Sequence, residues 1–85
     1  MAITGVSMTG QSGTIYGAVK DSMVSVTYIS SKKELPEFGM RISQEEFAKG
    51  AESKFVANFI KKIEAFGFNK KNVETMMRNL GKLLA

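Results

Sequence analysis

The sequence predicts an α+β fold, in which a three-stranded antiparallel meander is followed by two C-terminal helices packed on one face of the sheet. Two observations lead to this prediction. The first thirty residues alternate apolar and polar side chains with the period of two that is typical of strands. From residue 43 onward, apolar residues recur every three or four positions, as they do in amphipathic helices. A sheet of three strands is unstable alone, so we expect the helices to cover it.

Three segments carry the strand pattern, and they are residues 5–9, 14–20 and 23–30. In the third segment, Val24 and Val26 alternate with Ser25, as expected of a half-buried strand. The connections at residues 10–13 and 20–22 are short enough for hairpin loops. We therefore expect residues 1–30 to form a meander of neighbouring antiparallel strands.

Residues 31–42 are expected to form either a linker or a short fourth strand at an edge of the sheet. Pro36 cannot donate a backbone hydrogen bond to a neighbouring strand, and it biases Leu35 away from helical geometry. Residues 38–42 nevertheless contain apolar side chains at alternate positions. The sequence leaves both alternatives open.

A helix is predicted over residues 43–66, with Ser43 at its start. Ser43 and Glu46 have the spacing of a capping box, and Ile42 and Phe47 have the spacing of a hydrophobic staple. Six apolar residues share one arc of the helical wheel, and they are Phe55, Val56, Phe59, Ile60, Ile63 and Phe66.

The apolar arc does not extend into the first turns of this helix. On the same wheel Lys49 and Glu52 fall within the arc, whereas Phe47 falls outside it. Glycine costs roughly 1 kcal/mol inside a helix, so we favour a break near Gly50. The alternative is a continuous helix whose first two turns project past the core.

A second helix is predicted over residues 69–84. Gly67 suits the left-handed residue that ends a helix, and Asn69 suits the N-cap of the next one. Phe68 and Val73 repeat the staple spacing. The apolar stripe of this helix contains Val73, Met76, Met77, Leu80 and Leu84. Only one residue separates Gly67 from the cap, so the two helices are expected to meet in a tight corner.

The composition argues against several classes of function. The chain of 85 residues contains no cysteine and no histidine, so it lacks disulfides, sulfur-based metal centres and the usual general base near neutral pH. No segment approaches the roughly 18–20 apolar residues of a membrane span, and the first residues lack the pattern of a secretion signal. We expect residues 1–85 to form a single cytoplasmic domain that is not an enzyme and has no catalytic, metal or cofactor site.

The positive charge gathers in the C-terminal third of the chain. Residues 1–53 carry five basic and six acidic side chains, whereas residues 54–85 carry seven basic and two acidic ones. The candidate surface for a protein partner or a nucleic acid consists of Lys61, Lys62, Lys70, Lys71, Thr75 and Arg78. The simpler explanation is a solvated helix face that keeps the protein soluble.

The corner between the two helices fits part of the pattern of a DNA-binding helix-turn-helix. With Gly67 at the turn, Phe66, Phe68 and Val73 take positions where apolar residues are expected. Ile63, however, falls where the close crossing of the two helices needs a small residue. We favour an ordinary helical hairpin, and a DNA-binding corner is the alternative.

The sequence therefore favours a small non-catalytic protein-interaction module of the adaptor, regulator or inhibitor type. A chain of this size buries only roughly 60–65% of the surface that its unfolded form exposes. Without disulfides, a second copy of the chain is the expected source of added stability, so we expect a homo-oligomer, with a dimer favoured. The partner would bind either the free face and edge of the sheet or the lysine-bearing helices. The alternative function is nucleic-acid binding by the basic helix pair.

Overall fold

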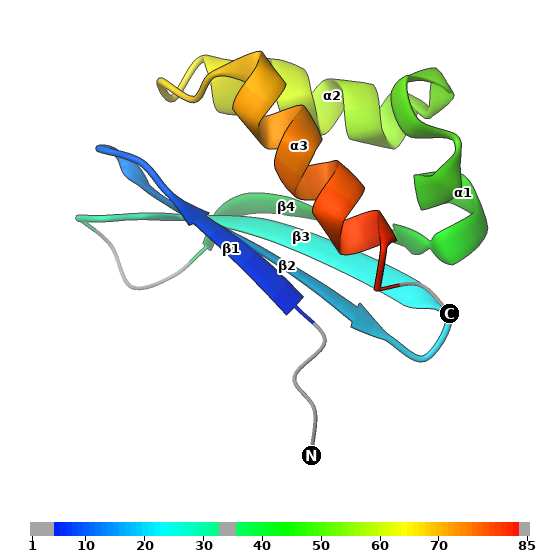
Figure 1. Ribbon diagram of the computed structural model, residues 1–85. Helices are drawn as coiled ribbons and strands as arrows, with labels where there is room; N and C mark the ends of the chain where they lie inside the picture. Colours follow the sequence, from blue (N-terminus) through cyan, green and yellow to red (C-terminus); the bar gives the residue numbers. More distant parts are fainter. Residues whose placement is uncertain (1–4, 33–35, 84–85) are drawn as a thin grey trace.

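A four-stranded antiparallel sheet forms one layer of the protein, and the helices form the other (Figure 1). The computed structural model describes residues 5–32 and 36–83. The strands are β1 (Gly5–Thr9), β2 (Gly13–Lys20), β3 (Met23–Ser30) and β4 (Pro36–Ser43), and they lie in the order β1-β2-β3-β4. The predicted α+β class is confirmed, with an antiparallel sheet followed by C-terminal helices.

The fourth edge strand that the sequence left open as an alternative is present, and it is longer than the short strand considered there. β4 has eight residues and pairs with β3, so the segment predicted as a linker or a short strand is a full member of the sheet. Phe38 and Met40 pack against the core from this strand, and Ile42 is buried. Contact with the helices therefore stabilises β4. The local sequence of this segment indicated a strand only weakly.

Both predicted hairpins are present. The amide of Gly10 donates to the carbonyl oxygen of Gly13 at 2.8 Å and closes the loop between β1 and β2. Asp21 and Ser22 connect β2 to β3, and Asp21 has a φ of +57°. The alternation in β3 also has the expected sense, because Val24, Val26 and Tyr28 are all fully buried.

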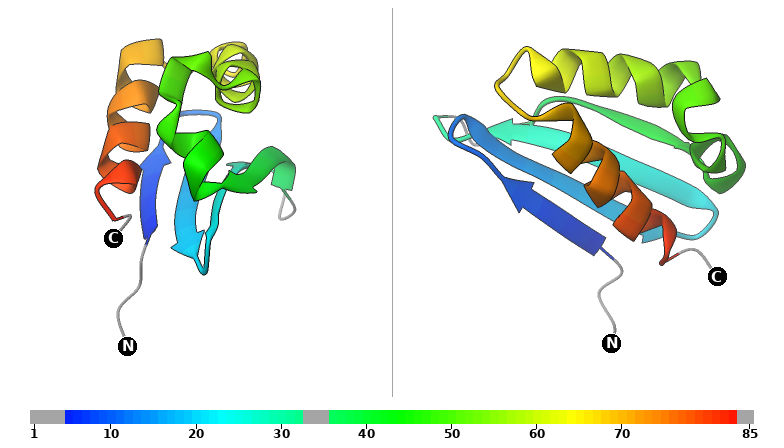
Figure 2. Two further views of the ribbon diagram at one scale, coloured as in Figure 1. Left: turned by 90° about the vertical axis from the view of Figure 1, so that its right-hand side faces the viewer. Right: turned by 45° about the horizontal axis from the view of Figure 1, so that its top comes forward.

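The helical layer contains more pieces than the two predicted helices. It consists of α1 (Gln44–Ala48), a 3₁₀ turn η1 (Gly50–Glu52), α2 (Lys54–Glu64) and α3 (Lys70–Gly81). The chain changes direction at Gly50, whose φ of +61° favours glycine. Ser53 then caps α2 by accepting a hydrogen bond from the amide of Val56. As a result, α1 lies near one end of the sheet and α2 runs back over β4 (Figure 2).

Gly67 and Asn69 form the corner between α2 and α3. Gly67 has a φ of +92°, and its amide donates to the carbonyl oxygen of Glu64 at 3.0 Å. The amide of Phe68 donates to the carbonyl oxygen of Ile63 at 3.4 Å, which completes a Schellman motif. The side chain of Asn69 accepts a hydrogen bond from the first turn of α3. These two residues therefore end one helix and begin the next, as their types predicted.

The core lies between the sheet and the helices. From the helices it includes Val56, Phe59, Ile60, Ile63, Val73, Met76, Met77 and Leu80. α3 packs over β1 and β2, and Gly17 gives Leu80 the room to do so, because a Cβ on Gly17 would lie 2.7 Å from Leu80 Cδ2. Leu84, the last residue of the predicted stripe, lies outside the described residues.

Phe55 and Phe66 do not belong to the core, which corrects the predicted apolar arc. Phe55 is 56% exposed and Phe66 is 39% exposed. α2 lies over β4, which is an edge strand, so side chains on the outer flank of α2 have no further strand beneath them. Phe55 lies on that flank, and Phe66 lies in the corner beyond the end of α2.

Tyr28 links the sheet to this corner. Its buried ring lies 5.0 Å from the ring of Phe66 and 5.8 Å from the ring of Phe68, measured between centroids. Its hydroxyl donates to Ser12 Oγ at 2.8 Å, and Ser12 Oγ donates to the carbonyl oxygen of Phe66 at 2.7 Å. The loop between β1 and β2, strand β3 and the helical corner are therefore held together at one point.

Phe68→Ala should lower the free energy of unfolding by about 3 kcal/mol, because it removes a buried ring from this cluster. The measurement is urea denaturation followed by circular dichroism. The control is Lys70→Glu combined with Lys71→Glu, two exposed positions where the change should stay within about 0.5 kcal/mol. Similar losses in the two proteins would contradict the placement of Phe68.

Candidate functional site

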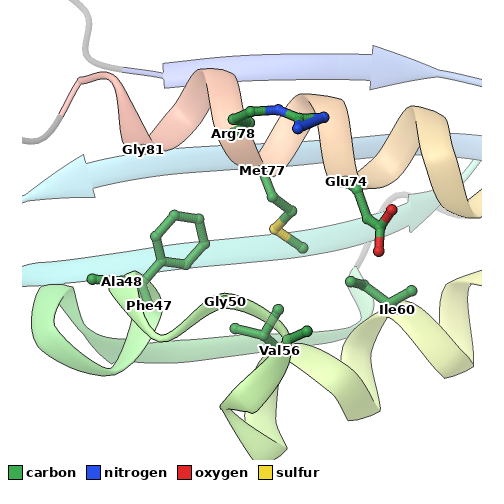
Figure 3. A pocket seen from close by; sticks show the side chains of 10 residues that line it. Phe47, Ala48, Gly50, Val56, Ile60, Glu74, Met77, Arg78 and Gly81 are labelled. Atoms are coloured by element: carbon green, nitrogen blue, oxygen red, sulfur yellow. The ribbon is translucent and has the colours of Figure 1, made fainter.

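A hollow of ≈ 550 Å³ lies between α3 on one side and α1, η1 and α2 on the other (Figure 3). The floor of the hollow is apolar and consists of Phe47, Val56, Ile60 and Met77. Its walls contain the small residues Ala48, Gly50, Ala51 and Gly81. Two charged residues, Glu74 and Arg78, lie at its rim. A hollow of this kind can accept large apolar side chains, while charged groups on the rim orient the molecule that carries them.

A second hollow, of ≈ 260 Å³, continues the first one toward the helical corner. The two hollows share Ala51, Ile60 and Glu74, and the second adds Lys61 and Lys70 to the lining. Together they form one channel between α2 and α3, which we call the helix groove. It follows α3 over most of its length, from Gly81 to Lys70.

The break at Gly50 creates the wide end of the helix groove. The chain turns there, and the wall on the side of α1 and η1 consists of the small residues Ala48, Gly50 and Ala51 beside the ring of Phe47. On the opposite wall, a Cβ on Gly81 would lie 3.8 Å from the ring of Phe47, which is ordinary van der Waals contact. The groove is therefore shaped by the backbone path and by the small residues along it.

Glu46 and Ser53 hold α1 and α2 together behind this wall. Ser53 is buried, and its hydroxyl accepts a hydrogen bond from the amide of Val56. Glu46 Oε1 lies 3.1 Å from Lys49 Nζ. Hydrogen bonding to the side chain of Ser53, and then to that of Lys49, lowers the pKa of the Glu46 carboxyl group. The ionised form of Glu46 therefore supports the bend between α1 and α2.

The structure places five of the six predicted surface residues on two different surfaces. Lys61, Lys70 and Arg78 line the helix groove. Lys71 and Thr75 lie on the outer face of α3, where Thr75 Oγ1 donates to the carbonyl oxygen of Lys71 at 2.9 Å. The groove and the outer face are adjacent, because they share α3.

The sixth residue, Lys62, lies on the opposite flank of α2, above β4. Its Nζ is 5.8 Å from the centroid of the Phe38 ring. Beside it, Phe55 lines a shallow hollow together with Gly39 and Met40 of β4. This apolar area was not predicted, because the helical pattern places Phe55 in the core and the β4 segment resembles a linker or a short strand. The alternating side chains of β4 were the signal that could have revealed it.

The face of the sheet opposite the helices is polar by comparison. Ser25 and Thr27 of β3 point to this face, because the residues between them are buried in the core. Tyr16 and Ala18 of β2 also point outward, and Tyr16 is 48% exposed. Lys20, Met23 and Arg41 line a further hollow on this face together with Ala18 and Ser25. The face therefore mixes polar, charged and apolar side chains.

Comparisons of the chain with protein-family models, with curated proteins and with solved structures give no match. Within residues 5–32 and 36–83, no helix is long and apolar enough to cross a membrane. The same residues contain no cluster of three potential metal-ligating side chains. The function is therefore argued from the geometry of the surfaces described above.

Acidification should destabilise the wild type more than Glu46→Gln. The pKa of Glu46 is lower in the folded protein than in the unfolded chain, so its contribution is present above the unfolded pKa and is lost as the pH falls through the folded pKa. We expect the urea midpoint of the wild type to fall further than that of Glu46→Gln between about pH 6 and about pH 3. Glu45→Gln, at an exposed neighbouring position, should behave like the wild type. Parallel profiles for wild type and Glu46→Gln would contradict the role of Glu46.

Proposed function

We propose that this protein is a non-catalytic interaction module that binds an amphipathic helical segment of a partner protein in the helix groove. The observation that carries the proposal is the hollow of ≈ 550 Å³ with an apolar floor and small-residue walls. Phe47, Ile60 and Met77 would contact the apolar side chains of the partner. Burial of such anchor side chains in a groove is the main source of affinity in helix-in-groove binding.

The dimensions of the groove favour a helix as the occupant. α3 has 12 residues, so one wall of the groove is about 18 Å long. A helix lying along it would present apolar anchors from about three turns, spaced three or four residues apart. The small side chains of Ala48, Ala51 and Gly81 let the backbone of such a helix approach closely.

The charges along the rim define the partner further. Lys70, Glu74 and Arg78 follow one another at intervals of four residues on α3, so they form a row along the groove. A partner helix with acidic side chains opposite Lys70 and Arg78 and a basic one opposite Glu74 would complement this row. Complementary charges of this kind select the partner and its orientation more than they add affinity.

The chemistry of the groove supports a binding role. The chain contains no histidine or cysteine, and the ionisable side chains at the groove are lysine, arginine and glutamate. A serine nucleophile would lack the histidine base that usually activates it. The groove therefore suits recognition of a partner better than reaction with a substrate.

Ala51→Trp should block binding of amphipathic helical peptides, because the indole ring would fill the groove from an exposed wall position. The probe is a peptide selected on the wild-type protein from a displayed library of amphipathic helices, with its affinity measured by fluorescence anisotropy. We expect the Kd to rise at least tenfold for Ala51→Trp.

The matched control is Ala18→Trp, which adds the same ring on the exposed face of the sheet. This variant should bind the selected peptide as the wild type does. Failure to select any peptide, or equal affinities for Ala51→Trp and wild type, would refute the proposal.

The outer face of α3 supports a second candidate function, nucleic-acid binding. Lys71 and Thr75 of α3 and its C-cap Lys82 are exposed on this face, and Arg78 lies at the border between this face and the helix groove, so the four residues follow one row along the helix. A row of basic and hydroxyl groups on an outer helix face suits contact with phosphates rather than with base edges.

Binding through this row would depend steeply on salt. For duplex DNA, the logarithm of the affinity should fall by about 0.9 per logarithm unit of salt for each phosphate contact. The measurement is anisotropy with mixed-sequence duplex DNA and single-stranded RNA. Lys71→Glu with Arg78→Glu should abolish binding, whereas the matched control, Lys54→Glu with Lys62→Glu on α2, should retain more of it. The absence of salt-dependent binding at micromolar protein would remove this candidate.

A further inference from the structure

β1 (Gly5–Thr9) is the edge strand beneath α3, and within the described part of the chain it pairs with β2 alone. Proteins usually protect such an edge against pairing by charged side chains, proline or a bulge. The opposite edge, β4, carries Pro36, Arg41 and a shift of register against β3. β1 has none of these features, so it is the edge to which a further strand can be added.

The pairing of β1 with β2 determines which backbone groups of β1 remain available. The amide of Gly10 donates to the carbonyl oxygen of Gly13 at 2.8 Å, and the register of β1 continues from there without a shift. In antiparallel strands every second residue directs its amide and carbonyl to the same neighbour. The residues two and four places before Gly10 therefore bond to β2. The residues that direct their backbone groups outward are Gly5, Ser7 and Thr9.

The side chains of β1 are complementary to those of a second, antiparallel β1. With Ser7 opposite Ser7 of a second copy, each Val6 lies opposite Met8 of the other copy, on the side that faces the helices. Val6 and Met8 are only partly buried where they pack against the core, so this pairing covers them further. On the other face small and hydroxyl side chains meet, because Gly5 lies opposite Thr9. Apolar pairs and hydroxyl pairs directly across two strands both stabilise the pairing.

The flank of α3 above this edge carries no charged side chain. The helix groove lies on the side of α3 that faces α2, and helical periodicity places four residues of α3 and its C-terminal turn on the opposite flank, namely Asn72, Met76, Asn79 and Leu83. Since α3 packs over β1 and β2 (Figure 2), this flank faces outward beyond β1. The charged residues of α3 line the groove or point away from the sheet. Two copies of this basic chain can therefore approach here without bringing lysines together.

We propose that two copies of this chain associate through their β1 strands, antiparallel and about a two-fold axis at Ser7, so that their two sheets become one. The partner is a second copy because the order of residues in β1 is its own complement and because the flank of α3 above it is uncharged. This inference goes beyond the docking function proposed above and uses none of the residues that line the helix groove.

The α3 helices of the two copies complete this interface. α3 follows β1 along its length, because a Cβ on Gly10 would lie 2.9 Å from the ring of Phe68, just before α3, and one on Gly17, opposite Val6, would lie 2.7 Å from Leu80 Cδ2. An axis midway between β1 and β2 is about one strand spacing, about 4.8 Å, from the line between the two copies. The two α3 helices would then be about 10 Å apart, which is the distance at which helices pack.

The position of the two-fold axis can be tested with one cysteine, because the native chain has none. Ser7→Cys places two thiols opposite one another, at a Cα separation of about 5.5 Å that allows a disulfide. The matched control is Ala18→Cys, exposed on the same face of β2, where the two Cα atoms would be more than about 14 Å apart. Mild oxidation should give a covalent dimer of Ser7→Cys while Ala18→Cys stays monomeric on a non-reducing gel.

Charges at the same position test the axis without a covalent bond. Ser7→Lys and Ser7→Glu each place like charges opposite one another, so each variant alone should associate roughly tenfold more weakly in sedimentation equilibrium. An equimolar mixture of the two variants brings opposite charges together and should recover most of the loss. Circular dichroism checks that each variant is folded, and Ala51→Trp should leave association unchanged.

The contribution of α3 is tested on its uncharged flank. Asn79→Lys places like charges between the two α3 helices and should weaken association, because Asn79 lies on the flank that faces the second copy. The matched control is Thr75→Lys, which adds the same charge on the outer face of α3 and should associate as the wild type does.

Two results would overturn the inference. The first is a wild-type protein that remains monomeric at about 100 μM in sedimentation equilibrium. This result excludes a second copy as the occupant, leaves the edge to an extended strand of another protein, and does not affect the docking function. The second is a dimer that Ser7→Lys does not weaken and in which Ser7→Cys cross-links no faster than Ala18→Cys, which excludes β1 as the interface.

Discussion

The burial of the Tyr28 side chain is the constraint on which the arrangement of the two layers depends. A hydroxyl group buried without a partner is costly, and the partner here is Ser12, in the loop between β1 and β2. Ser12 in turn donates to the backbone of Phe66, at the helical corner. The rings of Phe66 and Phe68 also pack on Tyr28, so these contacts together hold the corner over the sheet at this point.

The helix groove and the apolar area beside β4 both follow from the position of this corner. From it, α2 runs over β4 at one edge of the sheet and α3 runs over β1 and β2 near the other (Figure 2). The helices therefore leave a channel between them, and the bend at Gly50 widens it at its far end. For the same reason the outer flank of α2 extends past the last strand, which leaves Phe55 exposed beside the open edge of β4.

The sequence alone determined those features that depend on near neighbours in the chain. The hairpins, the caps at Ser43 and Asn69 and the helix end at Gly67 could be predicted because each rests on backbone bonds formed within a few residues. Only the tertiary structure decided the extent of β4, the exposure of Phe55 and the distribution of the basic residues over separate surfaces. These features depend on which strand lies at an edge and on how the helices cross the sheet, and such long-range contacts leave only a weak trace in local patterns. The basic residues of the candidate surface could be listed from the sequence. The helix groove that three of them line could not, because it depends on how α2 and α3 lie relative to each other.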